Sequence, residues 1–123
     1  MLKMVPMLVV MGTIFYLSHQ PGGSFNLPDI PNFDKLLHAG IYGVLAATVL
    51  FAAPVWLKTK SLALTAFVAV FVCFLYGISD EFHQSFIPGR DVSGWDLAAD
   101  VVGASGMAWF WLRRKAPNSL GKV

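Results

Sequence analysis

The chain has 123 residues, a length that predicts a single domain. Hydrophobic residues make up 56% of it and charged residues only 13%, against roughly 25% charged residues in typical soluble domains. This composition excludes an ordinary soluble domain, because too few polar side chains are present to cover its surface. The single cysteine excludes an intramolecular disulfide, and the nine Lys and Arg residues flank apolar runs without a nucleic-acid recognition motif.

Four apolar segments follow one another along the chain. They predict helices at about residues 2–19, 35–57, 61–86 and 94–113. A bilayer-spanning helix needs roughly 20 apolar residues, and the second and third segments meet this length easily. The first and fourth are short and span a membrane only if some of their polar flanks lie within it. The sequence therefore predicts an all-α fold, a four-helix transmembrane bundle, as one domain over residues 1–123.

The connections between these segments carry turn residues. Lys3 precedes the first segment as in a signal peptide, but no A-x-A-like cleavage site follows, so we expect this segment to be retained as a helix. Residues 20–33 are rich in Pro, Gly and Asn and form a loop, and His19 before them is expected at the surface. Residues 87–90 read as a turn, and Ser93 is a suitable N-cap for the last helix.

The charged residues separate into two groups along the predicted bundle. All seven carboxylates fall on one side of a four-span fold. Seven of the nine basic residues fall on the other side, namely Lys3, Lys58, Lys60, Arg113, Arg114, Lys115 and Lys122. Basic residues in short loops favour the cytoplasmic side of a membrane. We therefore expect both termini in the cytoplasm and the acidic end of the bundle at the outer membrane face.

Polar residues recur at helical spacing near the acidic end of the last three helices. Those of the second helix are Asp34, Lys35, His38 and Tyr42. Those of the third and fourth helices are Tyr76, Asp80, Glu81, His83, Gln84, Asp96 and Asp100. Ionisable side chains in apolar helices normally face the bundle interior, because exposure to lipid costs free energy. The pattern predicts a polar pocket at the outer membrane face.

Acid–base chemistry is one interpretation of this pocket. Histidines beside carboxylates can transfer protons near neutral pH. The predicted catalytic set is His38, His83, Glu81 and Asp34. The alternative is a structural network of salt bridges and hydrogen bonds, since buried ionic groups commonly pair without any chemistry. The sequence leaves open whether the protein is an enzyme.

Ligand binding is a second interpretation. Arg90 follows Pro88 and Gly89 before a helix N-terminus, an arrangement that favours phosphate or carboxylate. The predicted substrate-binding residues are Arg90, Lys35, Tyr42, Tyr76 and Gln84. Carboxylates with neighbouring imidazoles also suit a divalent metal such as zinc, manganese or iron. The predicted metal ligands are Asp80, Asp96 and Asp100, and the identity of any cofactor stays open.

Two blocks of the sequence, DKLLHAGIYG and YGISDEFHQSFIPGRDVSGWDLAADVVGASG, resemble the VanZ-like family of small bacterial membrane proteins. SHQP at the end of the first helix is a weaker third match. The resemblance implies a multi-pass protein of the bacterial cytoplasmic membrane, and the family includes a protein linked to teicoplanin resistance. The motif positions that it carries over are Asp34, Lys35, His38, Tyr42, Glu81, His83, Gln84, Arg90, Asp96 and Gly103. It assigns a catalytic role to none of them.

The expected function is that of an envelope protein whose pocket binds or modifies an outer-leaflet lipid or a lipid-linked cell-wall group. A role in resistance to a glycopeptide such as teicoplanin follows from the resemblance. The alternatives are a proton- or ion-coupled transport or binding module and a structural subunit of an envelope complex. Gly103 and Gly106 give the last helix a small face, which suits either a homodimer or packing within one protomer.

Overall fold

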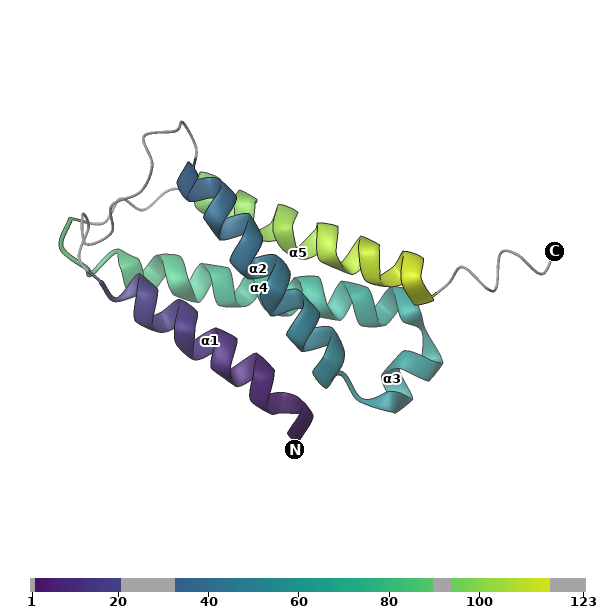
Figure 1. Cartoon of the computed structure of the whole chain (residues 1–123). Coiled ribbons are helices and arrows are strands. Elements are labelled where there is room, and N and C mark those ends of the chain that lie inside the picture. Colours follow the sequence, from purple (N-terminus) through teal and green to yellow (C-terminus); the bar gives the residue numbers. More distant parts are fainter. Residues whose placement is uncertain (1, 21–32, 90–93, 116–123) are drawn as a thin grey trace.

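The computed structural model describes residues 2–20, 33–89 and 94–115, without the side chain of Asp34. Its regular elements are all helical, as the sequence predicts (Figure 1). In chain order they are the 3-10 helix η1 (Leu2–Met4), α1 (Val5–Ser18), α2 (Phe33–Ala52), α3 (Val55–Lys60), α4 (Leu62–Gln84) and α5 (Gly94–Lys115). The short α3 joins α2 to α4, and the four longer helices pack into a bundle.

Within the described residues, two helices are long and apolar enough to cross a membrane. These are Lys35–Ala52 within α2 and Leu62–Gln84, which is all of α4. The apolar stretch that contains α1, Leu2–Ser18, is shorter. Helix α5 has 22 residues, but acidic and basic side chains at its two ends lower its hydropathy. Two of the four predicted spans therefore satisfy length and composition by themselves.

A proline ends the second helix earlier than the sequence analysis predicts. The expected helix over residues 35–57 stops at Ala52, and a separate helix, α3, begins at Val55. Pro54 between them has no N–H to donate and disfavours helical geometry in the residue before it. It serves as the N-cap of α3, with φ −66° and ψ 149°. Because of Pro54, the end of the expected helix forms the separate helix α3.

The turns on either side of α4 follow local sequence chemistry. Ser61 caps its start, where the Leu64 amide donates to Ser61 Oγ at 3.0 Å. After α4 the chain turns through Pro88 and Gly89, where a turn is predicted. Gly89 has φ 74°, a left-handed conformation that glycine adopts without a steric cost.

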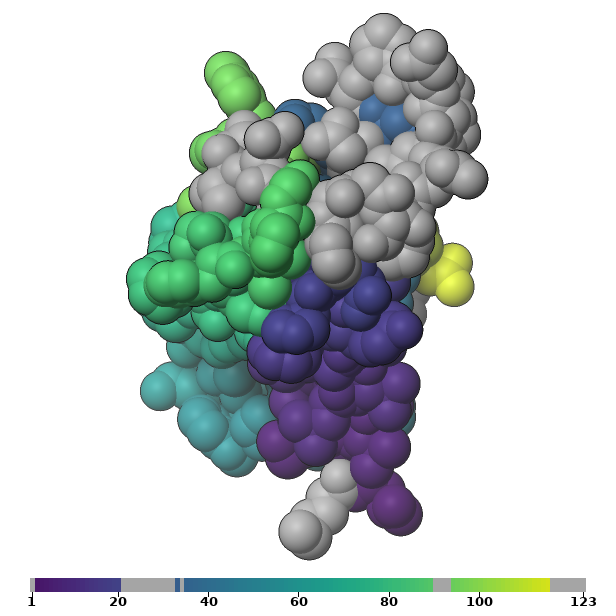
Figure 2. Space-filling model, turned by 90° about the vertical axis from the view of Figure 1, so that its left-hand side faces the viewer, coloured from purple at the N-terminus to yellow at the C-terminus, as the bar shows by residue number. Residues whose placement is uncertain are grey.

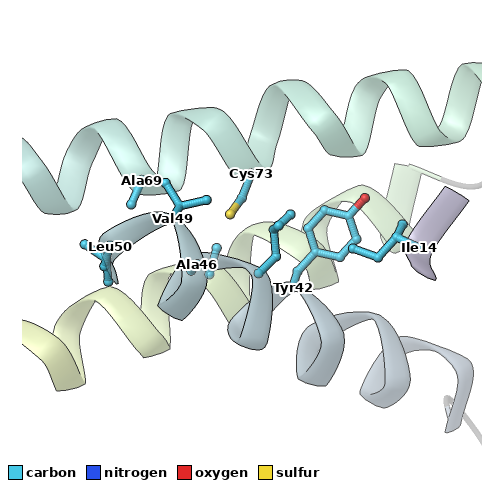
Figure 3. Packing of buried hydrophobic residues seen from close by; sticks show 9 residues of the cluster. Ile14, Tyr42, Ala46, Val49, Leu50, Ala69 and Cys73 are labelled. Atoms are coloured by element: carbon cyan, nitrogen blue, oxygen red, sulfur yellow. The ribbon is translucent and has the colours of Figure 1, made fainter. Parts of the chain in front are cut away.

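The hydrophobic core lies where α2 meets α4 and α5 (Figure 3). Tyr42 and Leu45 of α2 are fully buried, as is Cys73 of α4, which fits its expected role as a small core residue. Many large apolar side chains point outward instead, including Phe67 of α4 and Trp109 of α5, which are 65% and 62% exposed. An apolar exterior around a small core is the pattern of a bundle that is solvated by lipid.

Glycine brings two helix backbones into contact at the crossing of α2 and α5. A Cβ atom built on Gly103 would lie 1.9 Å from the carbonyl oxygen of Ala39, so a side chain cannot be added without moving a helix. Gly43 faces the same contact, because a Cβ atom built on it would lie 3.4 Å from the Gly103 carbonyl oxygen. A Cβ atom on Gly106 would meet nothing within 4 Å. Gly103 therefore packs within the protomer, while Gly106 lies on an open face.

The two ends of the bundle differ in charge. The C-terminal ends of α1 and α4 lie with the N-terminal ends of α2 and α5 at one end, and α3 lies at the other (Figure 1). The pKa of Lys58 in α3 lies below its ordinary value, because burial disfavours its charged form and because Lys3 and Lys115 lie nearby. Basic residues that are distant in sequence thus gather at the α3 end.

Candidate functional site

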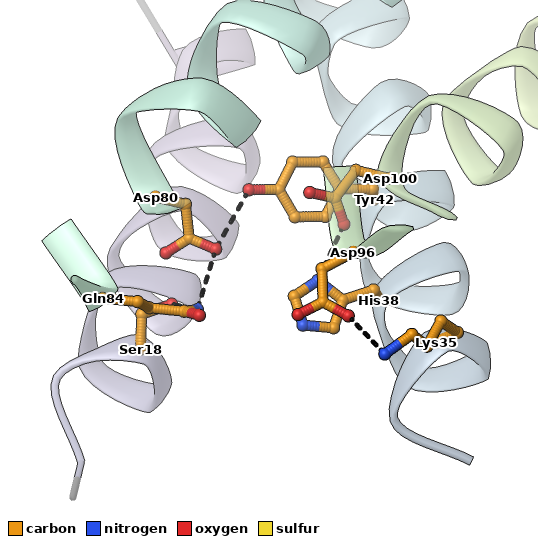
Figure 4. Close-up of polar contacts among 8 residues, drawn as sticks. All are labelled: Ser18, Lys35, His38, Tyr42, Asp80, Gln84, Asp96 and Asp100. Atoms are coloured by element: carbon orange, nitrogen blue, oxygen red, sulfur yellow. Dashed lines mark hydrogen bonds and ion pairs between the residues drawn. The ribbon is translucent and has the colours of Figure 1, made fainter. Parts of the chain in front are cut away.

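Polar side chains from four helices meet at the end of the bundle opposite α3 (Figure 4). We call them the polar cluster, and they are Ser18, Lys35, His38, Tyr42, Asp80, Gln84, Asp96 and Asp100. The ring of Tyr42 lies between two groups, with Asp80 on one side and Asp100 on the other. Six of the eight are buried, which is costly for polar groups in an apolar bundle unless they are paired.

The first group joins α2 to α5 and is centred on His38 and Asp100. His38 Nδ1 lies 2.8 Å from Asp100 Oδ1, within the length of a charge-assisted hydrogen bond. Asp100 is fully buried, whereas the His38 side chain is 19% exposed. The contact lies next to the Ala39–Gly103 crossing, because His38 precedes Ala39 and Asp100 is three residues before Gly103.

The second carboxylate oxygen of Asp100 faces α4. A Cβ atom on Gly77 would lie 3.0 Å from Asp100 Oδ2, so the absence of a side chain at Gly77 makes room for the carboxylate. Among the described residues, Oδ2 has no hydrogen-bond partner. A buried carboxylate oxygen normally accepts a hydrogen bond. This oxygen is therefore a place where a ligand, a water molecule or a proton would be stabilised.

A second pair stands beside the first, one helical turn nearer the end of the bundle. Lys35 Nζ lies 3.1 Å from Asp96 Oδ1, an ion pair by distance that lacks the angles of a good hydrogen bond. The Lys35 side chain is 30% exposed and that of Asp96 is 8% exposed. Lys35 was predicted to hold an anionic substrate, but here its charge lies against Asp96. A neutralised lysine attracts an anion less strongly.

The second group joins α4 to α1 and α2 through hydrogen bonds. Tyr42 Oη donates to Asp80 Oδ2 at 3.4 Å, and Gln84 Nε2 donates to the same oxygen at 3.4 Å. Gln84 Nε2 also donates to Ser18 Oγ at 3.2 Å. The four side chains form one buried chain across three helices. These bonds are longer than that of His38 with Asp100, and therefore weaker.

A pair of histidines lies beside this second group. His19 Nδ1 and His83 Nε2 are 3.1 Å apart, and the His83 ring stacks on Phe15 with centroids separated by 4.7 Å. His83 Nδ1 is buried and has no partner in the ranges that the structure describes. The sequence predicts a catalytic role for His83 and a surface position for His19. His19 is exposed, yet it ties the end of α1 to α4.

Two residues of the site were missed as candidates, Ser18 and His19. Both belong to SHQP, the weaker third match of the sequence analysis. Ser18 is buried against Gln84, and His19 contacts His83. The signal that could have found them is the position of this polar pair at the end of an otherwise apolar helix, on the same side as the carboxylates.

The remaining predicted site residues lie in different surroundings. Glu81 is buried near the end of α4, at 8% exposure. The Tyr76 hydroxyl donates to the Met11 carbonyl oxygen on α1, and the centroid of its ring lies 6.4 Å from that of Tyr42. Asp34 lies in the first turn of α2, four residues before His38, and its side chain is outside the described part. Arg90 also lies outside the described residues.

The carboxylates do not form one metal-binding group. In residues 2–20, 33–89 and 94–115, no three His, Cys, Asp or Glu side chains are arranged to hold a metal ion. Asp80 bonds to Tyr42 and Gln84, whereas Asp96 and Asp100 contact Lys35 and His38. A metal at Asp80, Asp96 and Asp100 stays a prediction of the sequence, and the contacts seen here do not add to it.

Comparison with known proteins agrees with the resemblance of the two sequence blocks. The VanZ/LLP1 family matches the chain over residues 3–114, a range that contains both blocks and every described residue of the polar cluster. Searches of curated proteins and of solved structures find no match. The family match covers nearly the whole chain, and two helices have the length and composition of membrane spans. The chain therefore belongs to the VanZ/LLP1 family of membrane proteins.

Proposed function

We propose that this protein is a four-span envelope protein whose polar cluster binds the polar group of an outer-leaflet lipid or lipid-linked cell-wall precursor. Both termini and the basic α3 end would face the cytoplasm, because Lys and Arg near helix ends favour that side. The polar cluster then lies near the outer surface of the bacterial cytoplasmic membrane. In this orientation α1 and α5 complete the bundle as the other two spans.

The contact between His38 and Asp100 carries this proposal. Burying a carboxylate in a membrane helix costs on the order of 3 kcal/mol on insertion scales. Asp100 is fully buried, and one of its oxygens lacks a partner among the described residues. A purely structural pair would satisfy both oxygens more readily, since each unsatisfied buried acceptor costs about 1–3 kcal/mol. The unfilled oxygen supports a role in binding.

The same pair supports chemistry on the bound group. A proton on His38 Nδ1 is donated to Asp100 Oδ1 at 2.8 Å, which leaves Nε2 as the basic nitrogen. A buried carboxylate that fixes the tautomer of an imidazole is the arrangement used for general base catalysis. His38 is partly exposed and can meet a ligand, whereas Asp100 orients it from within. Asp100 would then act as a positioning residue.

The test is retention of lipid by the purified full-length protein. The protein would be reconstituted in vesicles of phosphatidylethanolamine and phosphatidylglycerol with a polyprenyl phosphate, extracted gently and studied by native mass spectrometry. We expect the wild type to retain one of these lipids. We expect His38→Gln and Asp100→Asn to lower its occupancy at least tenfold.

The matched control is Lys60→Gln, at the opposite end of the bundle and exposed. Its lipid occupancy should equal that of the wild type. Equal occupancy in all four proteins would contradict the proposal, as would a wild type that retains no lipid. A change in the mass of the retained lipid that requires His38 would show that the site modifies its ligand.

A resistance role follows from the same proposal. A bacterial host that produces the wild-type protein should tolerate more teicoplanin than a host that produces Asp100→Asn at the same membrane level. The physical reason is that a glycopeptide acts on lipid-linked cell-wall material, which the polar cluster would bind. Equal susceptibility of the two hosts, with equal amounts of protein, would remove this role and leave lipid binding to be judged by mass spectrometry.

A second candidate function is favoured by the hydrogen-bond chain from Tyr42 through Asp80 and Gln84 to Ser18. Chains of buried acids and hydroxyl groups across membrane helices are typical of proton relays. Under this function, vesicles with the protein would show proton-driven solute flux that Asp80→Asn abolishes, without any covalent product. Flux that is independent of the pH gradient would contradict it.

A further inference from the structure

A groove runs between α1 and α4 on the side of the bundle. Its volume is about 300 Å³, and it is lined by Met11, Val72, Leu75, Tyr76 and Ser79. The lining is almost wholly apolar, because the Tyr76 hydroxyl is already used by the Met11 carbonyl oxygen. Figure 2 shows α1, in purple, lying along α4, whose end is green. The groove therefore offers carbon surface and very few groups for a polar ligand.

The direction of the groove follows from helical spacing. Val72, Tyr76, Ser79 and His83 are four, three and four residues apart, so they share one face of α4. From Val72 to Ser79 this face is about 10 Å long. One turn further on is His83, which stacks on Phe15 and contacts His19. The apolar groove thus leads to the histidine pair.

We propose that this groove holds one acyl chain of a membrane phospholipid, with the phosphate of the same lipid at the His19–His83 pair. The inference depends on the proposed function in one respect only, namely that the ligand is a lipid. It adds a second part to the site, on α1 and α4, and places the hydrocarbon part of the ligand there. The polar cluster then contacts the head of the lipid from one side only.

The lining favours a flexible chain over a helix from a partner protein. Helices that pack closely in membranes present small residues to each other. The groove is open to the outside and presents the large side chains of Met11, Leu75 and Tyr76. The same two helices also carry exposed apolar side chains, including Leu8 of α1 and Phe82 of α4. A hydrocarbon chain fits such a groove by changing its own conformation.

The histidine pair supplies the complement for a phosphate. His19 Nδ1 and His83 Nε2 lie 3.1 Å apart, so one of the two rings donates an N–H to the other. His83 Nδ1 has no partner among the described residues, so it can donate to a phosphate oxygen. The two carboxylates nearest in sequence are already engaged, since Asp80 accepts from Tyr42 and Gln84 and the buried Glu81 has an interaction of its own. The pair therefore prefers an anionic head to a cationic one.

Photolabelling tests this inference on the full-length protein in vesicles. The vesicles would contain phosphatidylethanolamine and a phosphatidylglycerol with a diazirine on its acyl chain, and labelled residues would be mapped by mass spectrometry after irradiation. We expect Met11, Leu75 and Ser79 to be labelled at least fivefold more than Phe110, which is 53% exposed on α5. Ser79→Phe fills the groove and should lower labelling of Met11 at least fivefold.

The matched control is Ile78→Phe, at the neighbouring position, which is exposed but does not line the groove. It should leave labelling of Met11 unchanged. Labelling that follows exposure alone on all helices, or that survives Ser79→Phe, would contradict the proposal that the groove holds an acyl chain. In that case, lipid retention by the wild type would still support the proposed function. Strong groove labelling with full lipid retention in Asp100→Asn would support the groove and contradict the proposed function.

Discussion

The polar end of the bundle has two sides that are built differently. On the α2–α5 side the backbones touch at Gly103, and the side-chain contacts are charged pairs at 2.8 and 3.1 Å. On the α1–α4 side a groove lies along the two helices, and the side-chain bonds to Asp80 are 3.4 Å long. Tyr42 lies between the two sides.

This difference indicates a division of roles within one site. Close backbone contact and short charge-assisted bonds fix the positions of groups, as a catalytic or binding pair requires. A groove with longer bonds can adapt to a ligand at a lower cost in free energy. We infer that α2 and α5 form the fixed side of the site and that α1 and α4 form its adaptable side.

The largest expected effect is that of Gly103→Ala. The new Cβ atom would lie 1.9 Å from the Ala39 carbonyl oxygen, so α2 and α5 must separate. We expect a loss of about 3 kcal/mol or more in the free energy of unfolding, measured by denaturant titration in detergent. The control is Gly106→Ala, where nothing lies within 4 Å and better helix propensity stabilises by up to about 1 kcal/mol. Equal stability of the two variants would disprove the close backbone contact of α2 with α5 at Gly103.

Asp100→Asn comes next in size. It keeps the shape of the side chain but replaces a charge-assisted hydrogen bond to His38 by a neutral one, which we expect to cost about 2 kcal/mol of stability. Asp96→Asn should cost less, about 0.5 kcal/mol, because Lys35 is partly exposed and water screens the pair. The same titration measures both variants. An equal loss of stability in both variants would mean that burial of Asp100 does not strengthen its contact with His38.

On the adaptable side we expect a smaller effect from Tyr42→Phe. It removes one hydrogen bond of 3.4 Å to Asp80 and should cost about 1 kcal/mol. The double variant with Asp80→Asn tests whether the two act together, because coupled neighbours do not show additive losses. Strict additivity in this cycle would show that the tyrosine does not join the two sides through Asp80.

The smallest expected change in stability is that of His19→Ala, at most about 0.5 kcal/mol, because His19 is an exposed residue. Its effect should instead be local, since it removes the contact that ties the end of α1 to His83. Amide hydrogen exchange should rise in the last turn of α1 and stay constant in the first turns of α5. Faster exchange in both places, or in neither, would argue against separate sides.

Local sequence rules predicted much of the helix pattern but missed the break between α2 and α3. Apolar segments and turn residues placed the four longer helices within a few residues of their observed bounds. Hydropathy carried the prediction through Pro54, although the chain stops its helix at Ala52. The reason is that an apolar run does not end at a proline, whereas backbone hydrogen bonding does. The presence of Pro54 was the signal that hydropathy alone did not use.

Helical spacing predicted which residues face inward, but not which of them pair. The pattern put His38 and Asp100 on polar stripes of different helices, and the structure joins them at 2.8 Å. The pairing depends on the crossing point of α2 and α5, which Gly103 sets and no local pattern contains. For the same reason Lys35, expected to bind an anion, lies against Asp96.

The sequence by itself determined the helical class and the separation of acidic from basic residues, because these depend on composition and periodicity. It also carried the family resemblance, which depends on the order of residues in two motif blocks. The tertiary structure decided that Ser18 and His19 of α1 contact α4, that Gly103 faces inward while Gly106 stays open, and that Asp100 keeps an unfilled oxygen. Such contacts join residues more than 60 positions apart. Their geometry depends on how whole helices cross, and the crossing is set by the packing of all side chains together.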